Sequence, residues 1–322
     1  MFITNKKLQK LLLIILFQIC SLSVHAESDL ETIITGADLG DNLVTSGRGN
    51  LIFEYVRVDS LSLKARSNDE EHLLSLSEGV ETVFHNREYI KLNFAFDNVK
   101  IKCEEISAKI LPSGRLYDTN WQWAYNGEKL DLLRLDGLGE GGLIKPYGSV
   151  RTENIIPVRR FNPGYNGLYI FGTPVGTFLR GSLDGKEVKD IQVIGEEMQD
   201  DILCDIIRGY VSETGDTITI WLAPGLMYRP KHIEMTSSIE KTVVHNTFKE
   251  YPGSIWFPAH IIKEEYYYDD ETGKETLHKQ ETLTVQDGYK LNIKLPDALF
   301  EVKFPLGMMV YDYRTGERKE IK

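Results

Sequence analysis

The stretch that decides the fold closes the chain: "LPDALFEVKFPLGMMVYDYRTG", residues 295–316. Its end echoes an earlier stretch, "YYYDDETGKETL", residues 266–277, since both place Thr-Gly between tyrosine-rich apolar residues and alternating charges. Neither stretch has the alternating ligands and closing glutamate of a twelve-residue calcium loop. Thr-Gly between two such segments is typical of a hairpin turn. We therefore expect Gly273 and Gly316 to adopt positive φ.

The dominant hydrophobic period along the chain is two, which indicates half-buried antiparallel strands. In "EYIKLNFAF" (88–96) the apolar residues fall on one side, and "DTITIWL" (216–222) repeats the pattern. In "GYKLNIKL" (288–295) the same period predicts that Tyr289, Leu291, Ile293 and Leu295 share one face of a strand. Gly-, Asp- and Thr-containing turns separate these runs, as hairpins require. The pattern therefore predicts a meander of neighbouring strands in the second half.

Helical signals are few. The segments 27–43 and 67–79 could each form a short helix, and 174–182 is a third candidate weakened by its glycines. The predicted fold class is mainly β with few helices, in which a large antiparallel sheet curls because so many strands seldom stay flat. Its apolar concave face would form a groove, filled either by the protein's own helices or by a ligand.

Residues 1–26 have the pattern of a secretory signal peptide: three lysines, the apolar run "LLLIILFQICSLSV", and Ala26 at the expected cleavage position. We expect residues 27–322 to form one domain with a long insertion at about 134–167, and no membrane span after cleavage. The whole chain carries a formal charge of −11. That acidity disfavours nucleic acids and anionic membrane surfaces as partners.

Two cysteines, Cys103 and Cys204, lie beyond the expected signal peptide. In an oxidising compartment they could form a disulfide that closes a long loop. Two separate buried thiols are the equally weighted alternative. Neither arrangement implies redox chemistry, because the sequence has no C-x-x-C motif.

No catalytic signature occurs in the sequence. It lacks the nucleophile elbow, the zinc-protease helix motif and the phosphate-binding glycine loops. His232 and Glu234 would share one strand face, but two ligands do not make a zinc site, so a surface His–Glu pair is the better interpretation. We therefore predict no enzyme activity, no catalytic residue, no metal site and no cofactor.

The aromatic residues are more informative. Trp121 and Trp123 would share one strand face, and Trp221 and Trp256 end or begin other strands. Ordinary core packing explains such residues in many proteins. The functional interpretation is that some of them line a hydrophobic groove. The candidate groove residues are Phe94, Phe96, Trp121, Trp123, Trp221 and Trp256.

The C-terminal half resembles a known family. "ITIWLAPGLMYRPKHIEM" (218–235), "SIWFPAHIIKEEYY" (254–267) and the closing stretch follow the order of motifs in outer-membrane lipoprotein-sorting-like proteins of the LolA/LolB/RseB type. The resemblance covers about residues 216–318. It implies a half-open antiparallel barrel that wraps around helices and holds acyl chains in an apolar cavity.

Sequence and resemblance together favour a periplasmic or otherwise exported bacterial envelope protein that binds a hydrophobic ligand, such as a lipid or a lipoprotein acyl chain. The alternative is a structural or sensory envelope module that contacts another protein and fills its groove with its own side chains. An enzyme with two facing carboxylates ranks third, because abundant Asp and Glu are not evidence for a paired site.

Overall fold

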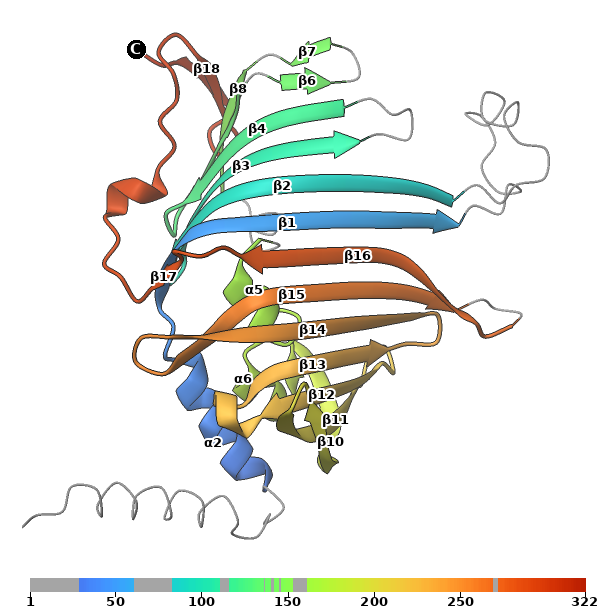
Figure 1. The fold of residues 1–322 in the computed structure, drawn as a ribbon. Coiled ribbons are helices and arrows are strands. Elements are labelled where there is room, and N and C mark those ends of the chain that lie inside the picture. Colours follow the sequence, from blue (N-terminus) through green and yellow to red (C-terminus); the bar gives the residue numbers. More distant parts are fainter. Residues whose placement is uncertain are drawn as a thin grey trace, which may run out of the picture.

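The structure is a computed structural model that describes residues 29–60, 83–110, 116–135, 137–139, 142–144, 146–152, 161–268 and 272–322. Figure 1 shows one long curved sheet with a few helices packed against it. This open, mainly β architecture with helices in its concave face is the half-open barrel that the sequence predicts, and the fold class is confirmed.

The strands form a single continuous ladder. From one edge to the other the order is β10, β11, β12, β13, β14, β15, β16, β1, β2, β3, β4, β5, β8, β18 and β19. Neighbours are antiparallel except β8 and β18, which run parallel. The bounds are β1 Ser46–Ser60, β2 Val83–Asp97, β3 Lys100–Ile110, β4 Leu116–Tyr125, β5 Leu130–Arg134, β8 Tyr147–Arg151, β10 Lys186–Gln199, β11 Ile202–Val211, β12 Thr217–Ala223, β13 Arg229–Thr236, β14 Glu240–Tyr251, β15 Ile255–Tyr268, β16 Glu275–Val285, β18 Met309–Asp312 and β19 Glu317–Glu320.

Small elements complete the fold. They are the helices α2 Leu30–Asp41, α5 Pro163–Gly167 and α6 Val175–Leu179, the strands β6 Gly137–Gly139, β7 Gly142–Ile144, β9 Ser182–Leu183 and β17 Lys290–Leu291, and the 3₁₀ turns η1 Pro224–Leu226 and η2 Asp297–Phe300.

Strand β1 joins the two halves of the sheet. All fifteen of its residues, Ser46–Ser60, pair with β2, and Leu51 to Arg57 also pair with β16 on the other side. Because successive side chains of a strand point to opposite faces, Leu51 and Phe53 face the concave side while Asn50 and Ile52 face the outer side. The register of β1 therefore decides which residues each face of the sheet presents.

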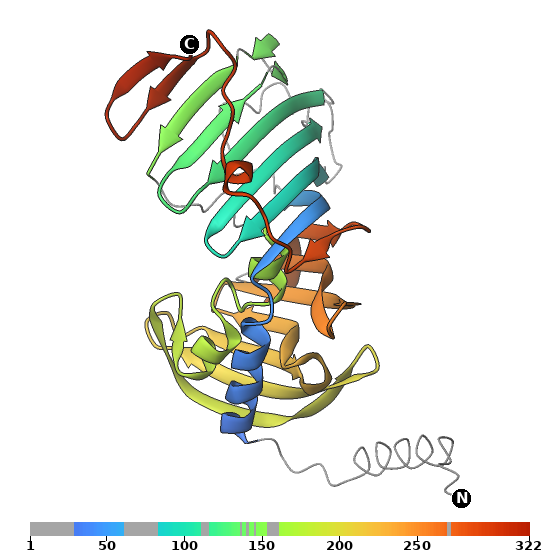
Figure 2. The same cartoon turned by 90° about the vertical axis from the view of Figure 1, so that its left-hand side faces the viewer.

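The half from β10 to β16 is the more strongly curled. Its ladders contain register shifts in the pairs β10–β11, β12–β13, β14–β15 and β15–β16, whereas the pairs from β1 to β5 contain none. A bulge bends its strand and increases the local twist, so these shifts favour curvature in that half. Figure 2 shows α2 lying in the hollow of this curled half.

Helix α2 confirms the prediction of a helix within residues 27–43. Asp29 caps its start by accepting a hydrogen bond from the Thr32 backbone N–H at 2.7 Å, and Ile33 and Ala37 are buried against the sheet. The weak third candidate, 174–182, contains the five-residue α6. The second predicted helix, 67–79, lies outside the described residues.

The C-terminal strap, residues 292–308, corrects the prediction of a strand over 288–295. Only Lys290 and Leu291 pair with β1, and the chain then leaves the ladder. Tyr289 packs in the main core, whereas Leu295 packs with Ala95 in a different cluster. The alternation therefore does not place four apolar residues on one face, because the chain crosses the sheet within that segment.

The strap covers the outer face of β2 to β5. Its apolar side chains pack on small or apolar residues of those strands, in two clusters that contain Ala95, Leu295 and Phe300, and Ala124, Leu133 and Val302. The ammonium group of Lys102, which is buried, donates a hydrogen bond of 3.0 Å to the Glu301 carbonyl. Figure 2 shows this segment running across the sheet.

Both Thr-Gly turns are confirmed. Gly273 has φ of 64° and Gly316 has φ of 74°, and the second glycine lies between the paired strands β18 and β19. The described residues of the expected insertion at 134–167 include β6, β7, β8 and α5. Strand β8 is part of the main ladder, since it pairs with β5 and β18.

Phe300→Ala should destabilise the protein by about 3–5 kcal/mol, the usual cost of removing a buried phenylalanine ring. Phe300 is 1% exposed and anchors the strap to the sheet. Urea unfolding followed by circular dichroism measures the change. Leu306→Ala is the matched control, because Leu306 is 80% exposed in the same segment. A loss below about 1 kcal/mol for Phe300→Ala would show that the strap contributes little.

Candidate functional site

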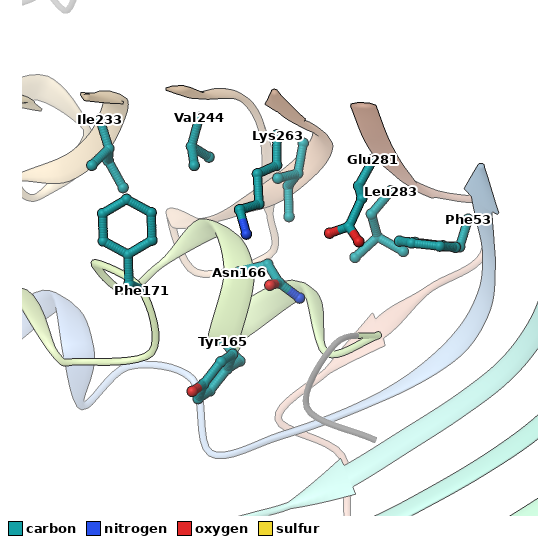
Figure 3. Close-up of a pocket in the computed structure, with 10 residues that line it drawn as sticks. Phe53, Tyr165, Asn166, Phe171, Ile233, Val244, Lys263, Glu281 and Leu283 are labelled. Atoms are coloured by element: carbon teal, nitrogen blue, oxygen red, sulfur yellow. The ribbon is translucent and has the colours of Figure 1, made fainter. Parts of the chain in front are cut away.

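The candidate site is a cavity of about 180 Å³ between the concave face of the sheet and α5. Figure 3 shows its lining residues, which come from β1, β13, β14, β15, β16, α5 and the segment after α5. They are Phe53, Tyr165, Asn166, Phe171, Ile233, Val244, Ile261, Lys263, Glu281 and Leu283. We call this space the concave-face cavity.

The strand register explains the composition of the cavity floor. Phe53 pairs with Leu283, and Leu283 pairs with Ile261, so one row across three strands is entirely apolar. The next row on the same face contains Glu281, Lys263 and Val244, followed by Ile233. The cavity therefore has an apolar floor with one charged side.

The charged side belongs to a network of alternating charges. Lys263 lies 2.8 Å from Glu265, which lies 3.1 Å from Lys279, and Lys279 lies 3.2 Å from Glu281. Burial acts to raise the pKa of Glu265, but Lys263 and Lys279 hold it below its usual value. Glu265 therefore stays ionised at neutral pH, and the cavity has a polar rim of both signs.

A second cavity, of about 450 Å³, lies at the C-terminal end of α2. We call it the helix-end cavity; its lining includes Asp41, Phe96, Tyr165 and Tyr169. Tyr165 lines both cavities, so its side chain lies between them. Its ring packs on Gly172, where an added Cβ would lie 2.1 Å from the ring, and φ there is +86°. A larger residue at 172 would displace Tyr165.

A buried ion pair supports the helix-end cavity. Arg229, 2% exposed at the start of β13, lies 2.9 Å from Asp41 and also donates to the Gly40 carbonyl at the end of α2. A cation in this position satisfies a helix carbonyl that has no partner within the helix. Burial raises the pKa of Asp41 to about 6, although Arg229 acts to lower it, and burial lowers the pKa of Arg229.

Four of the six predicted groove residues lie on the concave face. Phe94 and Phe96 are buried in the main core, and Phe96 also lines the helix-end cavity. Trp123 stacks on Phe161 at 6.0 Å, and Trp121 meets Trp123 edge-on at 6.2 Å. Phe161 in turn contacts Phe53 at 5.1 Å, so an aromatic chain leads to the wall of the concave-face cavity.

The other two, Trp221 and Trp256, belong to a separate hydrophobic cluster with Cys204. Trp221 donates a hydrogen bond of 2.7 Å from its indole N–H to Glu197. The structure therefore does not bring the six residues together in one groove. Both Cys103 and Cys204 are free thiols, buried in different clusters.

The predicted His–Glu pair forms, but its histidine is buried and only Glu234 is partly exposed. His232 Nε2 lies 2.9 Å from Glu234 Oε1, and His232 Nδ1 lies 3.0 Å from His245 Nδ1. His232 is only 7% exposed, because Trp221 packs edge-on against its ring at 4.5 Å. The bond from His232 lowers the pKa of Glu234. Among the described residues, no group of three His, Cys, Asp or Glu is placed to hold a metal ion.

Sequence patterns contain no direct signal for the cavity residues. Val244, Ile261 and Leu283 follow the strand alternation, but alternation does not tell which strands are neighbours. Lys263 and Glu281 lie in charged stretches of their strands, where the sequence alone would place them on a solvent-facing side. The lining residues near the glycine-rich segment, among them Tyr165 and Phe171, lie where no periodic pattern predicts a position.

No family model matches the chain, and no curated protein matches it. Among solved structures, a DUF1329 family protein from Desulfovibrio piger is 12% identical, with a TM-score of 0.36 over 84% of this chain and 97% of that one. A LolA superfamily protein from Nitrosomonas europaea is 15% identical, with a TM-score of 0.30 over 85% and 98%. The lipoprotein LppX of Mycobacterium tuberculosis is 11% identical, with a TM-score of 0.27 over 84% and 99%.

A LolA superfamily protein is thus among the matches, as the resemblance of residues 216–318 predicts. With identities of 15% or less and TM-scores below 0.5, these likenesses carry no conclusion about what this chain binds. Within the described part of the chain, none of the helices has the length and apolar character needed to cross a membrane.

Both thiols should resist alkylation in the folded protein. Burial raises the pKa of Cys103 well above its usual value and that of Cys204 to about 11, so little thiolate forms at pH 8. Iodoacetamide labelling before and after unfolding in urea, read by mass spectrometry, measures this. In protein that lacks the expected signal peptide, residues 1–26, we expect Cys103 and Cys204 to be labelled only after unfolding, and without a reductant. Labelling that requires a reductant would show a disulfide.

Asp41→Asn should flatten the dependence of stability on pH between about 4 and 6. The folded pKa of Asp41 is raised from 3.8 to about 6, so the folded state binds this proton more tightly and the wild type loses stability as pH rises through that window. This difference in pKa corresponds to about 3 kcal/mol. Urea unfolding at several pH values measures the slope. Asp184→Asn, at an exposed turn with φ of 47°, is the control and should keep the wild-type slope.

Proposed function

We propose that this chain is an exported envelope protein that binds a hydrophobic ligand, such as a lipid or a lipoprotein acyl chain, without covalent chemistry. The observation that carries the proposal is the concave-face cavity, with its apolar row of Phe53, Leu283 and Ile261 beside a charged rim. An apolar floor next to fixed charges suits an amphiphile. Burial of each methylene contributes about 0.8 kcal/mol before ordering costs.

Cavity size limits what can enter. The concave-face cavity of about 180 Å³ is smaller than the roughly 300–1,000 Å³ typical of ligand pockets. The helix-end cavity of about 450 Å³ lies on the other side of Tyr165. We therefore propose that the end of one acyl chain of the ligand occupies the concave-face cavity. Rotation of Tyr165 would connect this cavity to the helix-end cavity for a longer acyl chain.

The charged rim gives the ligand an orientation. Figure 3 shows Lys263 and Glu281 pointing into the space between the sheet and α5. Because the rim carries both signs and is only partly exposed to water, it would favour a ligand with a zwitterionic head. The signal peptide expected at residues 1–26 supports an exported location.

Native mass spectrometry of the full chain, purified from its own envelope, tests the proposal directly. Bound mass that denaturation releases, and that organic extraction identifies as lipid, is the expected result. Protein that is consistently free of bound mass would contradict it.

Val244→Phe should reduce binding of the fluorescent fatty acid cis-parinaric acid at least tenfold. Val244 is buried on the cavity floor, and a phenyl ring there would occupy the space that a ligand needs. Because the cavity accommodates the ring, the melting temperature should change little, whereas overpacking a filled core costs about 1–3 kcal/mol.

Ile239→Phe is the matched control for this substitution. Ile239 is 61% exposed, so the same kind of change there should leave both binding and stability unaltered. Equal affinity of the wild type and Val244→Phe for the probe would exclude the concave-face cavity as the binding site.

The second candidate function is a structural or sensory module that contacts another envelope protein. It is favoured by the extent to which the protein fills its own concave face: Ile33 of α2 and Phe178 of α6 are fully buried in the main core. Purified protein that carries no lipid, and that captures a partner from envelope extracts equally well as the wild type and as Val244→Phe, would support this candidate over the first.

A further inference from the structure

A groove of about 720 Å³, with both polar and apolar lining, lies on the outer face of β1 to β4, opposite the concave-face cavity. We call it the outer-face groove. Amide and charged side chains line it together with three apolar or aromatic residues that are at least partly exposed, Ile52, Tyr89 and Ile106. The proposed lipid site uses none of the outward-pointing side chains.

The strand register arranges three amides and the Glu104 carboxylate in one row, which we call the amide row. Asn50 pairs with Asn93, Asn93 pairs with Glu104, and Glu104 pairs with Gln122, so the four side chains cross four adjacent strands. At about 4.8 Å between neighbouring strands, the row is about 14 Å long. A second row, two residues further along each strand, contains Lys91, Ile106 and Asn120.

The groove has a regular floor and is bordered on two sides. The ladders of β1 to β4 contain no register shift, so no bulge bends this face. The C-terminal strap covers the row that includes Ala95 and Ala124, which is next to the amide row. Gln286 and Asp287 close another side. A regular floor with two borders suits an extended ligand rather than a compact one.

The hydrogen-bonding capacity of the row is largely unused within the protein. Among the described residues, the side-chain hydrogen bond found in this row joins Asn93 Nδ2 to Glu104 Oε2. Its length of 3.5 Å is too great for a strong bond. Each amide side chain both donates and accepts. Hydroxyl groups do the same, so a row of amides complements a row of hydroxyls.

We propose that the outer-face groove binds an extended, neutral oligosaccharide. The amide row would pair with sugar hydroxyls, and the exposed surfaces of Tyr89 and Ile106 would pack on the apolar faces of the rings. The charged residues of the lining are Lys91, Glu104 and Asp287, so the groove has no excess of positive charge that would attract a polyanion. An extended peptide fits less well, because peptides usually add to a sheet edge and β1 to β4 are paired on both sides.

Isothermal titration of the full chain with cellohexaose and chitohexaose tests the proposal. Saturable binding to at least one of them is expected, with affinity reduced at least tenfold in Asn93→Ala and in Gln122→Ala. Gln192→Ala is the matched control, since Gln192 is an exposed strand amide on β10, far along the ladder from the groove. Thermal melting of each variant establishes that it is folded.

Three results would overturn the proposal. They are the absence of saturable binding to both oligosaccharides, binding that the groove substitutions leave unchanged, and tighter binding to the acidic polymer oligogalacturonate. Binding of a neutral hexapeptide that the same substitutions abolish, without binding of either oligosaccharide, would instead assign the groove to peptides. Retention of cis-parinaric acid binding in Asn93→Ala separates this site from the proposed lipid site.

Discussion

The register of β1 is the constraint on which the rest of the structure depends. This strand pairs with β2 along its whole length and with β16 on its other side, and it thereby joins the curled half to the flatter one. A slip of one residue would turn Asn50 and Ile52 toward the core and expose Leu51 and Phe53, because side chains alternate between the faces. Burial of the Asn50 amide without partners would cost free energy, and the apolar row of the concave-face cavity would be lost.

In each half of the sheet, another segment of the chain packs on one face, and the covered face differs between the halves. In the curled half, α2, α5 and α6 cover the concave side, and bulges provide the bend that surrounds them. In the flatter half, the C-terminal strap covers the outer side of β2 to β5. One continuous ladder therefore carries two packed layers, and the amide row lies beside the strap on a part of the outer face that the strap does not cover.

The local sequence pattern predicted individual strands, turns and helices better than it predicted which elements pack against one another. Alternation identified β2 and β12, the turn residues identified the conformations of Gly273 and Gly316, and α2 has a clear N-cap. The pairing of Phe53 with Leu283 joins residues far apart in sequence, and no local signal contains it. The same limit explains the tryptophans: period two placed them on strands but could not show that Trp221 and Trp256 pack with Cys204 while Trp123 reaches Phe161.

The alternation of β1 and β2 also keeps the two proposed sites chemically separate. Leu51 and Leu92 form an inward-pointing cross-strand pair, and the adjacent pair of Asn50 and Asn93 points outward. A substitution on one face does not remove side-chain contacts on the other face, because the two faces share only the backbone. The backbone hydrogen bonds fix the strand spacing, so a ligand inside the cavity can alter the outer row only by moving whole strands. Tyr165, whose rotation we propose, and the rest of α5 lie on the concave side and do not contribute to the amide row.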